Sequence, residues 1–490
     1  MDKIRCSFAK NGKACNIFTV MCWGRMTIAL VVAFILIAMI LLSSSNGYFG
    51  NIHGQKTLKS STHKTSPAAT VAALSKASPA PASPKGKIPT LVNEKDSQNL
   101  SIQRFFRGLV YPSNMAFLGP NDILVTEKTN GTVMRIINGT MLKEPLLDLN
   151  VAVSDERGML GIAVSKESKL PRYVFVYFTG SQTKDGDDLQ GKKPTGNFLY
   201  RYELENNKLV NGKLLLDLPA APGPHHNAGK ILIGPDNNVY VVIGDVDGSR
   251  TYTQNIGSGP PSDGTSIIYR ITQDGKPVGN GILGTTSPVN KYYAYGIRNS
   301  FGLDFDPLTK KLWDTENGPG FGDEINLVEP GFNSGWVKVQ GFWIPQTYFG
   351  GPVATTPPAG LVDFGGKGKY SPPEFVWNQT VGVTAIKFLN SDKLGQQYQN
   401  TIFVGDINNG NIYHFELNKN RTSLLLNSSL ADKIANTTEE RNKVVFAKGF
   451  AGISDIEVSP YDGYLYILTF HKSQGSIYRI VPHTDKSQQS

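Results

Sequence analysis

Two loops of the chain carry residues whose types and spacing could do acid–base or electrostatic chemistry. In GPHHNAGK (223–230), His225 and His226 stand together before an apolar strand pattern. A histidine at such a junction can act as a general base near neutral pH, or can simply be a loop histidine bonded to the backbone. In YAYGIRNSFGLDFDP (293–307), Arg298 and Asn299 precede another strand pattern. This pair could present a fixed cation and an amide, or serve only as a structural buttress.

A third loop, TENGPGFGDEINLVEPGFNSGW (315–336), is rich in oxygen ligands. Its Gly318-Pro319 turn exposes carbonyl oxygens, and Asp323 and Glu324 add carboxylates close by. Oxygen ligands of this kind suit Ca²⁺. The spacing lacks the regularity of an EF-hand loop, so an ordinary polar connection is the alternative interpretation.

The elements that must position these loops form a repeat that begins near residue 105. Each copy has an alternating apolar strand, a Pro/Asp/Asn/Gly turn, a second apolar strand and a Gly-led third strand. The clearest copies are ILIGPDNNVYVVIGD (231–245), ISDIEVSPYDGYLYILTF (453–470) and NMAFLGPNDILVTE (114–127), and three weaker copies bring the number to six. Short strands at a regular larger period indicate blades around an axis. We therefore predict an all-β, six-bladed β-propeller, with a β-sandwich or barrel as the alternative.

Together the three loops resemble the signatures of PQQ-dependent soluble sugar dehydrogenases, the glucose/sorbosone dehydrogenase family. The matching segments are HxxGK(I/L)xxGPDxxxYxxxGD, Y(A/T)xGxRNxxGLxFDP, (E)xGPxxxDE(I/V)NLxxxGxNxGW, and GMLGIAV after Asp155-Glu156. The resemblance spans roughly residues 105–482 and implies a six-bladed propeller, in agreement with the repeat.

The resemblance also implies roles for the residues that match the family's motifs. His226 matches a catalytic histidine that takes the hydroxyl proton while hydride passes to the quinone. Arg298 and Asn299 match a pair that contacts the quinone oxygens, and Glu156 occupies the place of a polar residue beside the cofactor.

The implied calcium sites fall in the third loop. Gly318 and Pro319 match a turn whose carbonyls hold the cofactor's Ca²⁺. Asp323 and Glu324, with Ser334 where an aromatic residue is usual, match a second, structural Ca²⁺ site.

The chain departs from the family's pattern where that pattern supplies cations for the three carboxylates of PQQ. Asn408 stands at the position of a lysine, and Gly452 and Ser454 stand where arginines are usual. Lys230, Lys387 or Lys448 could compensate for the lost charge. His225 stands where an acidic residue often precedes the catalytic histidine, so the base could be tuned differently.

The N-terminal region predicts a membrane anchor followed by a stalk. A basic tail (1–25) precedes an uncharged apolar run that begins at Met26, and we predict a single-pass transmembrane segment over 26–43 with the N-terminus inside. A cleaved signal peptide is the alternative. Residues 44–97 are rich in Ser, Pro, Ala and Lys, which predicts a disordered stalk, and the propeller is assigned to 98–484.

Charge and composition narrow the function further. The formal charge of +9 comes from the tail and stalk, so the body is close to neutral and a nucleic-acid partner is not expected. All three cysteines lie before the apolar run, and seven Asn-x-Ser/Thr sequons support an exterior body only mildly.

These features favour an extracytoplasmic oxidoreductase at the cell membrane that acts on aldose sugars or related alcohols with PQQ and Ca²⁺. The electron acceptor is not indicated. The alternative is a non-catalytic propeller of the same superfamily that binds carbohydrate or protein.

Overall fold

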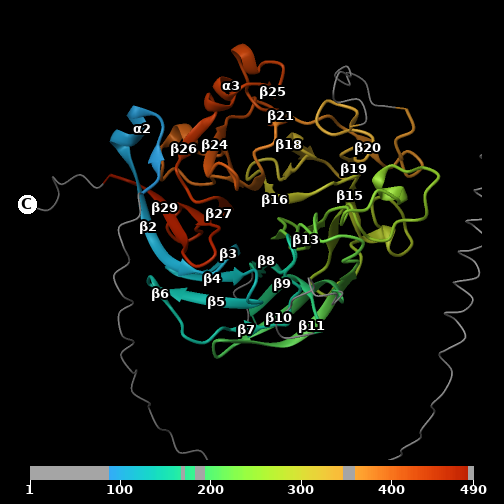
Figure 1. The fold of residues 1–490 in the computed structure, drawn as a ribbon, viewed down its shortest axis with the longest axis horizontal. Helices are drawn as coiled ribbons and strands as arrows, with labels where there is room; N and C mark the ends of the chain where they lie inside the picture. The colour runs from blue at the N-terminus through green and yellow to red at the C-terminus, as the bar shows by residue number, and fades with distance from the viewer. Residues whose placement is uncertain (1–87, 167–171, 183–193, 346–358, 484–490) are drawn as a thin grey trace, which may run out of the picture. The chain divides into compact units, whose positions relative to one another are not determined.

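The computed structural model describes residues 88–166, 172–182, 194–345 and 359–483. The predicted tail, the transmembrane segment and most of the predicted stalk lie outside these ranges. Within them, no helix is both long and apolar enough to cross a membrane. The body is an all-β propeller (Figure 1).

The described strands pair into six separate sheets. The first three hold the following strands in chain order. Sheet one comprises β3 (Pro112–Gly119), β4 (Asp122–Glu127), β5 (Thr132–Ile137), β6 (Thr140–Met141) and β7 (Leu147–Asp148). Sheet two comprises β8 (Met159–Val164), β9 (Arg172–Gly180), β10 (Gly196–Glu205) and β11 (Lys208–Leu218). Sheet three comprises β12 (Ile231–Ile233), β13 (Val239–Ile243), β14 (Ile267–Ile271), β15 (Tyr292–Tyr295), β19 (Phe332–Asn333) and β20 (Lys369–Tyr370).

The remaining three sheets include strands from both ends of the body. Sheet four comprises β16 (Ser300–Phe305), β17 (Leu312–Glu316), β18 (Phe321–Val328), β21 (Phe375–Gln379) and β25 (Ile434–Ala435). Sheet five comprises β22 (Val383–Phe388), β23 (Ile402–Asp406), β24 (Asn411–Phe415), β26 (Val445–Lys448) and β1 (Thr90–Leu91). Sheet six comprises β27 (Ile453–Val458), β28 (Leu465–Thr469), β29 (Gly475–Pro482) and β2 (Leu100–Leu109).

Helices in the described residues are short. The two α-helices are α2 (Glu94–Asn99) and α3 (Thr438–Asn442). The 3₁₀ turns are η1 (Tyr252–Gln254), η2 (Val289–Lys291), η4 (Gln396–Tyr398) and η5 (Ser428–Leu430).

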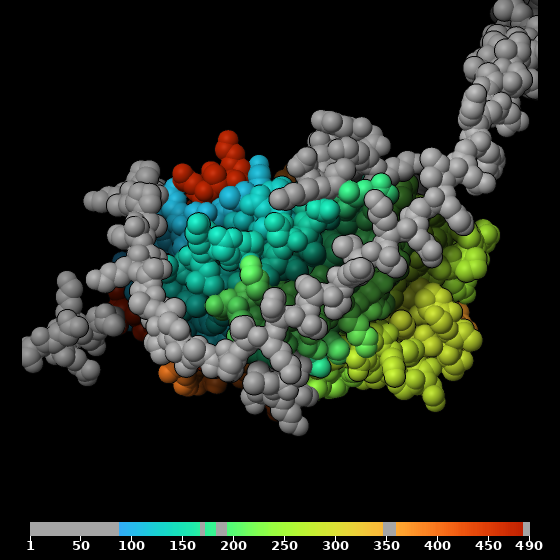
Figure 2. Space-filling model, turned by 90° about the horizontal axis from the view of Figure 1, so that it is seen from below, coloured from blue at the N-terminus to red at the C-terminus, as the bar shows by residue number. Residues whose placement is uncertain are grey.

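The inner strand of each sheet, which is the first strand of its repeat, lies at the centre. Each inner strand contacts the inner strand of the next sheet, and these contacts close a ring. β3 contacts β8, and contacts continue through β12, β16, β22 and β27 back to β3. The N-terminal strand β2 pairs antiparallel with β29, so the two ends of the body meet in one sheet. Consecutive segments of the chain lie side by side in the view from below, from cyan through green to yellow (Figure 2). The ring places the starts of all six inner strands at one end of the axis.

Packing between neighbouring sheets explains why the middle strands are apolar on both faces. Every residue of β13 (VYVVI) and of β28 (LYILT) is buried. The turn before β13 needs a left-handed residue, which Asn237 supplies at φ 61°. Asparagine tolerates this conformation, so the PDNN sequence forms the tight turn that the repeat predicts.

The ordered body begins earlier than the predicted boundary at residue 98. Thr90–Leu91 forms β1 and pairs with β26, and the Val92 amide donates to the Phe446 carbonyl at 2.9 Å. Leu91 packs against the hydrophobic core. The preceding residues are rich in Ser, Pro and Lys, so their composition predicted a disordered stalk and this short edge strand was not predicted.

Burial of His414 in β24 predicts a loss of stability in acid. Its ring packs 5.0 Å from the Phe403 ring centroid, and its Nε2 lies 2.9 Å from the Thr401 hydroxyl. Burial lowers the pKa of His414 from 6.5 to about 4. The unfolded chain therefore takes up this proton first, so the stabilisation is complete above about pH 6.5 and is lost as the pH falls toward 4. We expect the free energy of unfolding to be about 2 kcal/mol lower at pH 5 than at pH 7 from this group.

Denaturant unfolding of the His414→Gln variant checks this expectation. The variant should lose about that much of the pH dependence between pH 5 and 7. Equal slopes in the variant and the parent protein would contradict it.

Candidate active site

A cavity of about 460 Å³ lies at the end of the axis where the inner strands begin, and we call it the front cavity. Its wall includes residues at or near the starts of these strands, among them Asn114, Val383 and Ser454. Six of the predicted site residues line it: Glu156, His226, Arg298, Asn299, Gly318 and Asp323. Pro319 and Glu324 are not part of this wall. The structure therefore brings together loops that lie far apart in the sequence.

His226 is held by two carboxylates. Its Nδ1 lies 2.5 Å from Asp245 Oδ1, and its backbone amide donates to Glu156 Oε2 at 2.5 Å. The residue has φ 62°, a left-handed conformation that the HHNAG turn imposes before β12. The imidazole is mostly buried, with 13% of the side chain exposed.

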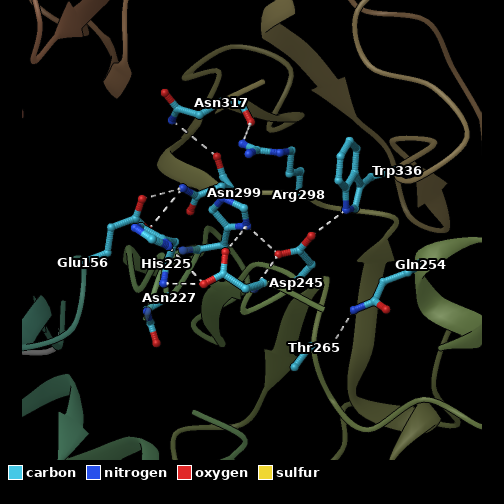
Figure 3. Close-up of polar contacts among 12 residues, drawn as sticks. Glu156, His225, Asn227, Asp245, Gln254, Thr265, Arg298, Asn299, Asn317 and Trp336 are labelled. Atoms are coloured by element: carbon cyan, nitrogen blue, oxygen red, sulfur yellow. Dashed lines mark hydrogen bonds and ion pairs between the residues drawn. The ribbon is translucent and has the colours of Figure 1, made fainter. Parts of the chain in front are cut away.

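The Asp245 carboxylate is itself fixed in place. Its Oδ2 accepts from Trp336 Nε1 at 2.6 Å, and its Oδ1 accepts from the Asp247 amide at 2.9 Å (Figure 3). A carboxylate at Nδ1 favours the tautomer with the proton on that nitrogen, which leaves Nε2 as the basic atom. The pair is thus suited to take a proton from a bound hydroxyl group.

Sequence reasoning missed both Asp245 and Trp336 as site residues. Both residues belong to recognised motifs: Asp245 ends the HxxGK(I/L)xxGPDxxxYxxxGD motif, and Trp336 ends the GFNSGW segment. Only the fold shows that the two side chains meet beside His226, because they come from different parts of the chain.

Glu156 and Asn299 form a second pair across the cavity. Asn299 Nδ2 lies 3.1 and 3.2 Å from the two carboxylate oxygens of Glu156 (Figure 3). Burial raises the pKa of Glu156, while the nearby positive charge of a protonated His226 acts in the opposite direction. Glu156 therefore links the histidine loop to the Arg-Asn pair, as its predicted place beside the cofactor requires.

Arg298 is positioned by three contacts. Its Nη1 donates to the Asn317 carbonyl at 2.7 Å, and its backbone amide donates to Glu316 Oε1 at 2.7 Å. Its guanidinium lies 5.2 Å from the Trp336 ring centroid. Burial lowers the pKa of Arg298 and raises the pKa of Glu316 to about 7. Among the described residues, no group accepts a hydrogen bond from Arg298 Nε, and none donates one to Asn299 Oδ1.

The two carboxylates of the predicted structural calcium site bind protein groups. Asp323 accepts from the amides of Gly318, Val381 and Gly382 at 2.8–2.9 Å. Glu324 is buried, and its oxygens accept from Gln340 and Gly341 and, at 3.0 Å, from Asn326. These hydrogen bonds hold neighbouring loops together. Burial raises the pKa of both carboxyl groups.

Ser334, at the position where the family has an aromatic residue, donates to Glu316 Oε2 at 2.7 Å. Within the described ranges, no three His, Cys, Asp or Glu side chains are grouped so that they could hold a metal ion. The Ca²⁺ sites stay predictions.

Two of the three positions that depart from the family pattern line the front cavity. Asn408 and Ser454 line the front cavity, and Gly452, at φ 93°, lies two residues before Ser454. Of the three lysines considered as replacements, Lys230 lines the cavity, while Lys387 and Lys448 do not. Lys230 is 4% exposed and already binds two carboxylates, Asp455 at 2.6 Å and Glu457 at 2.8 Å.

The charges on the wall are balanced. Lys128, Lys230 and Arg298 face Asp155, Glu156 and Asp323. His225 lies in an acidic setting at the rim, with Nδ1 3.0 Å from Asp247 and Nε2 3.8 Å from Asp155. The front cavity therefore has convergent polar groups but no excess of positive charge.

Comparison with known proteins shows the family of the chain. The family model described as Glucose / Sorbosone dehydrogenase matches residues 109–479. The aldose sugar dehydrogenase YliI of Escherichia coli is 25% identical over 383 residues, which cover 76% of this chain and 91% of that protein.

Two solved structures show the same fold. The soluble aldose sugar dehydrogenase from Escherichia coli in its apo-form has a TM-score of 0.60 and 22% identity, covering 78% of this chain and 100% of that one. The PQQ-bound aldose sugar dehydrogenase from Streptomyces coelicolor has a TM-score of 0.57 and 20% identity, covering 78% and 98%.

Proposed function

Because the chain belongs to the glucose/sorbosone dehydrogenase family, we propose that it is an oxidoreductase that oxidises aldose sugars or related alcohols. The observation that carries the proposal is the His226–Asp245 pair, whose histidine lines the same cavity as Arg298 and Asn299. A base of fixed tautomer next to a cation and an amide is suited to take the hydroxyl proton of a CH–OH group while a bound acceptor takes the hydride.

The residues of the site have different roles in the proposed reaction. The substrate hydroxyl gives its proton to His226 Nε2, and the Asp245 carboxylate stabilises the imidazolium that forms. The hydrogen on the carbon that carries this hydroxyl leaves as hydride. A bound ortho-quinone would be the acceptor of this hydride. Arg298, held by Asn317 and Trp336, places positive charge where the acceptor gains electrons.

One unused donor fits the reactive end of PQQ. Arg298 Nε has no acceptor among the described residues, and a quinone oxygen is a hydrogen-bond acceptor. The Gly318-Pro319 carbonyls would hold Ca²⁺ against the cofactor, as the family resemblance implies. We propose PQQ and Ca²⁺ as the cofactors on this basis.

The carboxylates of PQQ would be held by neutral donors, because Asn408 and Ser454 stand where the family pattern has cations. Restoring a charge should therefore tighten binding: we expect Asn408→Lys to lower the Kd for PQQ by about ten- to a hundredfold. Fluorescence titration with PQQ measures this. Asn409→Lys is the matched control. An unchanged Kd in Asn408→Lys would show that residue 408 does not face the cofactor.

The proposal is tested by reconstituting the chain with PQQ and Ca²⁺ and following dye reduction with a panel of aldoses. A rate that needs PQQ and a sugar together supports the enzyme. Failure of PQQ to bind the folded chain would refute this mechanism.

A second function is favoured by one observation, the balanced charge of the front cavity. A binding propeller that has kept the scaffold would need no cations for PQQ, and its cavity would take a neutral carbohydrate or a protein loop. Sugar binding that is unaffected by PQQ, without dye reduction, would support this function.

We further propose that the six sheets are six blades, one for each sequence repeat. We also propose that residues 26–43 anchor the chain with the propeller on the extracytoplasmic side. Protease protection in sealed membrane vesicles tests the second statement, since the propeller should be accessible only from that side.

A further inference from the structure

A second cavity, of about 610 Å³, lies at the opposite end of the axis, and we call it the rear cavity. Its wall includes the ends of all six inner strands, which are Phe117 in β3, Val164 in β8, Ile233 in β12, Phe305 in β16, Phe388 in β22 and Val458 in β27. The front cavity is lined near the starts of the same strands. None of the residues assigned to the proposed oxidation lines the rear cavity.

Buried ion pairs separate the two cavities. Lys230 in the front wall binds Asp455 and Glu457, and Glu457 Oε2 binds Lys387 at 2.7 Å. Lys387 also lies 3.3 Å from Asp304. In this group two cations, Lys230 and Lys387, partly offset the charge of three carboxylates, Asp455, Glu457 and Asp304.

The carboxylates that line the rear cavity all have cationic partners. Asp304 and Glu457 bind Lys387, and Asp306 accepts from Arg421 Nε at 2.7 Å. Each carboxylate of the wall therefore has a cation within 3.3 Å, although Asp304 and Glu457 share Lys387.

Three cations of the same wall have no carboxylate partner among the described residues. Lys166 Nζ donates to the Gly234 carbonyl at 3.2 Å, and Arg172 Nη1 donates to the Leu118 carbonyl at 2.5 Å. Lys310 Nζ donates to the Pro307 carbonyl. Burial lowers the pKa of Lys166, the charges of Lys387 and Lys310 act in the same direction, and the charges of Asp304 and Asp236 act in the opposite direction. An anion between these groups would relieve their repulsion.

The wall between the cations is apolar and partly aromatic. Phe117, Phe305, Phe388 and Tyr461 line the cavity, as does Pro235. Concave sites with apolar walls and a few convergent charges are typical of small-molecule binding. The combination suits a ligand with an apolar ring and a multiply charged anionic group.

We propose that the rear cavity binds a small organic phosphate, with the phosphate among Lys166, Arg172 and Lys310 and the apolar part against the aromatic wall. The site is independent of the proposed oxidation, because the axial ion pairs separate it from His226.

Calorimetric titration of the full chain with phenyl phosphate tests the proposal. We expect one molecule to bind per chain, more tightly than inorganic phosphate because the ring gains apolar contacts, with affinity that falls as salt rises. Phenol, which lacks the charge, should not bind measurably. Absence of saturable phenyl phosphate binding, or equal binding of phenol, would overturn the proposal.

Two variants locate the site. Lys310→Asn and Lys166→Gln should each weaken phenyl phosphate binding by about tenfold or more, since each removes one charge-assisted contact. Asparagine suits position 310, where φ is 62°. The matched control is Lys276→Gln, an exposed lysine away from the cavity wall. Thermal melting confirms folding of each variant, and unchanged binding in both cavity variants would overturn the assignment.

Discussion

Replacing His226 by asparagine is expected to lower kcat for sugar oxidation by about a hundred- to ten-thousandfold, the usual contribution of a general base. Asparagine tolerates the positive φ at this position, and its amide can still donate to Asp245 in place of Nδ1. The variant therefore removes Nε2 while it preserves the loop. Steady-state dye reduction with the reconstituted chain measures the effect.

The neighbouring histidine gives a matched control. His225 is about half exposed and binds Asp247 rather than Asp245, so His225→Asn should change kcat by only a few-fold. Asp245→Asn should also reduce kcat strongly, because it no longer fixes the tautomer, while PQQ binding persists. If His226→Asn keeps most of the parent activity, the base lies elsewhere.

The second large effect concerns stability. Lys230→Met is expected to lower the free energy of unfolding by about 3–5 kcal/mol, because it leaves buried carboxylates without their cation. Lys230 Nζ lies 2.6 Å from Asp455 Oδ1 and 2.8 Å from Glu457 Oε1, and its side chain is 3% exposed. In this variant Glu457 keeps Lys387 as a partner. Most of the lost free energy of unfolding therefore comes from the unpaired Asp455 carboxylate.

The loss should depend on pH. Burial already raises the pKa of Asp455 to about 6, and removing Lys230 raises it further. Protonation then neutralises Asp455 at low pH, so the destabilisation should be larger at pH 8 than at pH 5. Guanidinium unfolding at both values measures this.

The double variant Lys230→Met/Asp455→Asn should recover part of the stability, because the uncompensated charge is gone. Lys276→Met serves as the exposed control. A destabilisation by Lys230→Met no larger than that of this control would contradict the account of the axial ion pairs.

The sequence was sufficient to predict the propeller and most of the front cavity. Period-two alternation and PDNN-type turns are local, so the strands and their repetition could be recognised directly. His226, Arg298, Asn299 and Glu156 were identified because family motifs surround them, and the fold brings all four to one cavity.

The rest depends on contacts between distant segments. The bond from Trp336 to Asp245 joins residues 91 positions apart, so neither motif alone could reveal it. Lys230 was a possible replacement for a missing cation, yet its ammonium faces Asp455, 225 positions away. The start of the body was missed because two strand residues, Thr90–Leu91, were outweighed by the composition around them.

The proposed function requires the front cavity to bind a quinone that oxidises sugars, although the charges of its wall are balanced. The most direct measurement is a titration of the full chain with PQQ in the presence of Ca²⁺, followed by fluorescence and by dye reduction with an aldose. We expect saturable PQQ binding and a rate of dye reduction that follows occupancy. In His226→Asn this rate should be lost while PQQ binding remains. Sugar binding to the folded chain without any bound PQQ would contradict the proposed function and would identify the propeller as a binding module.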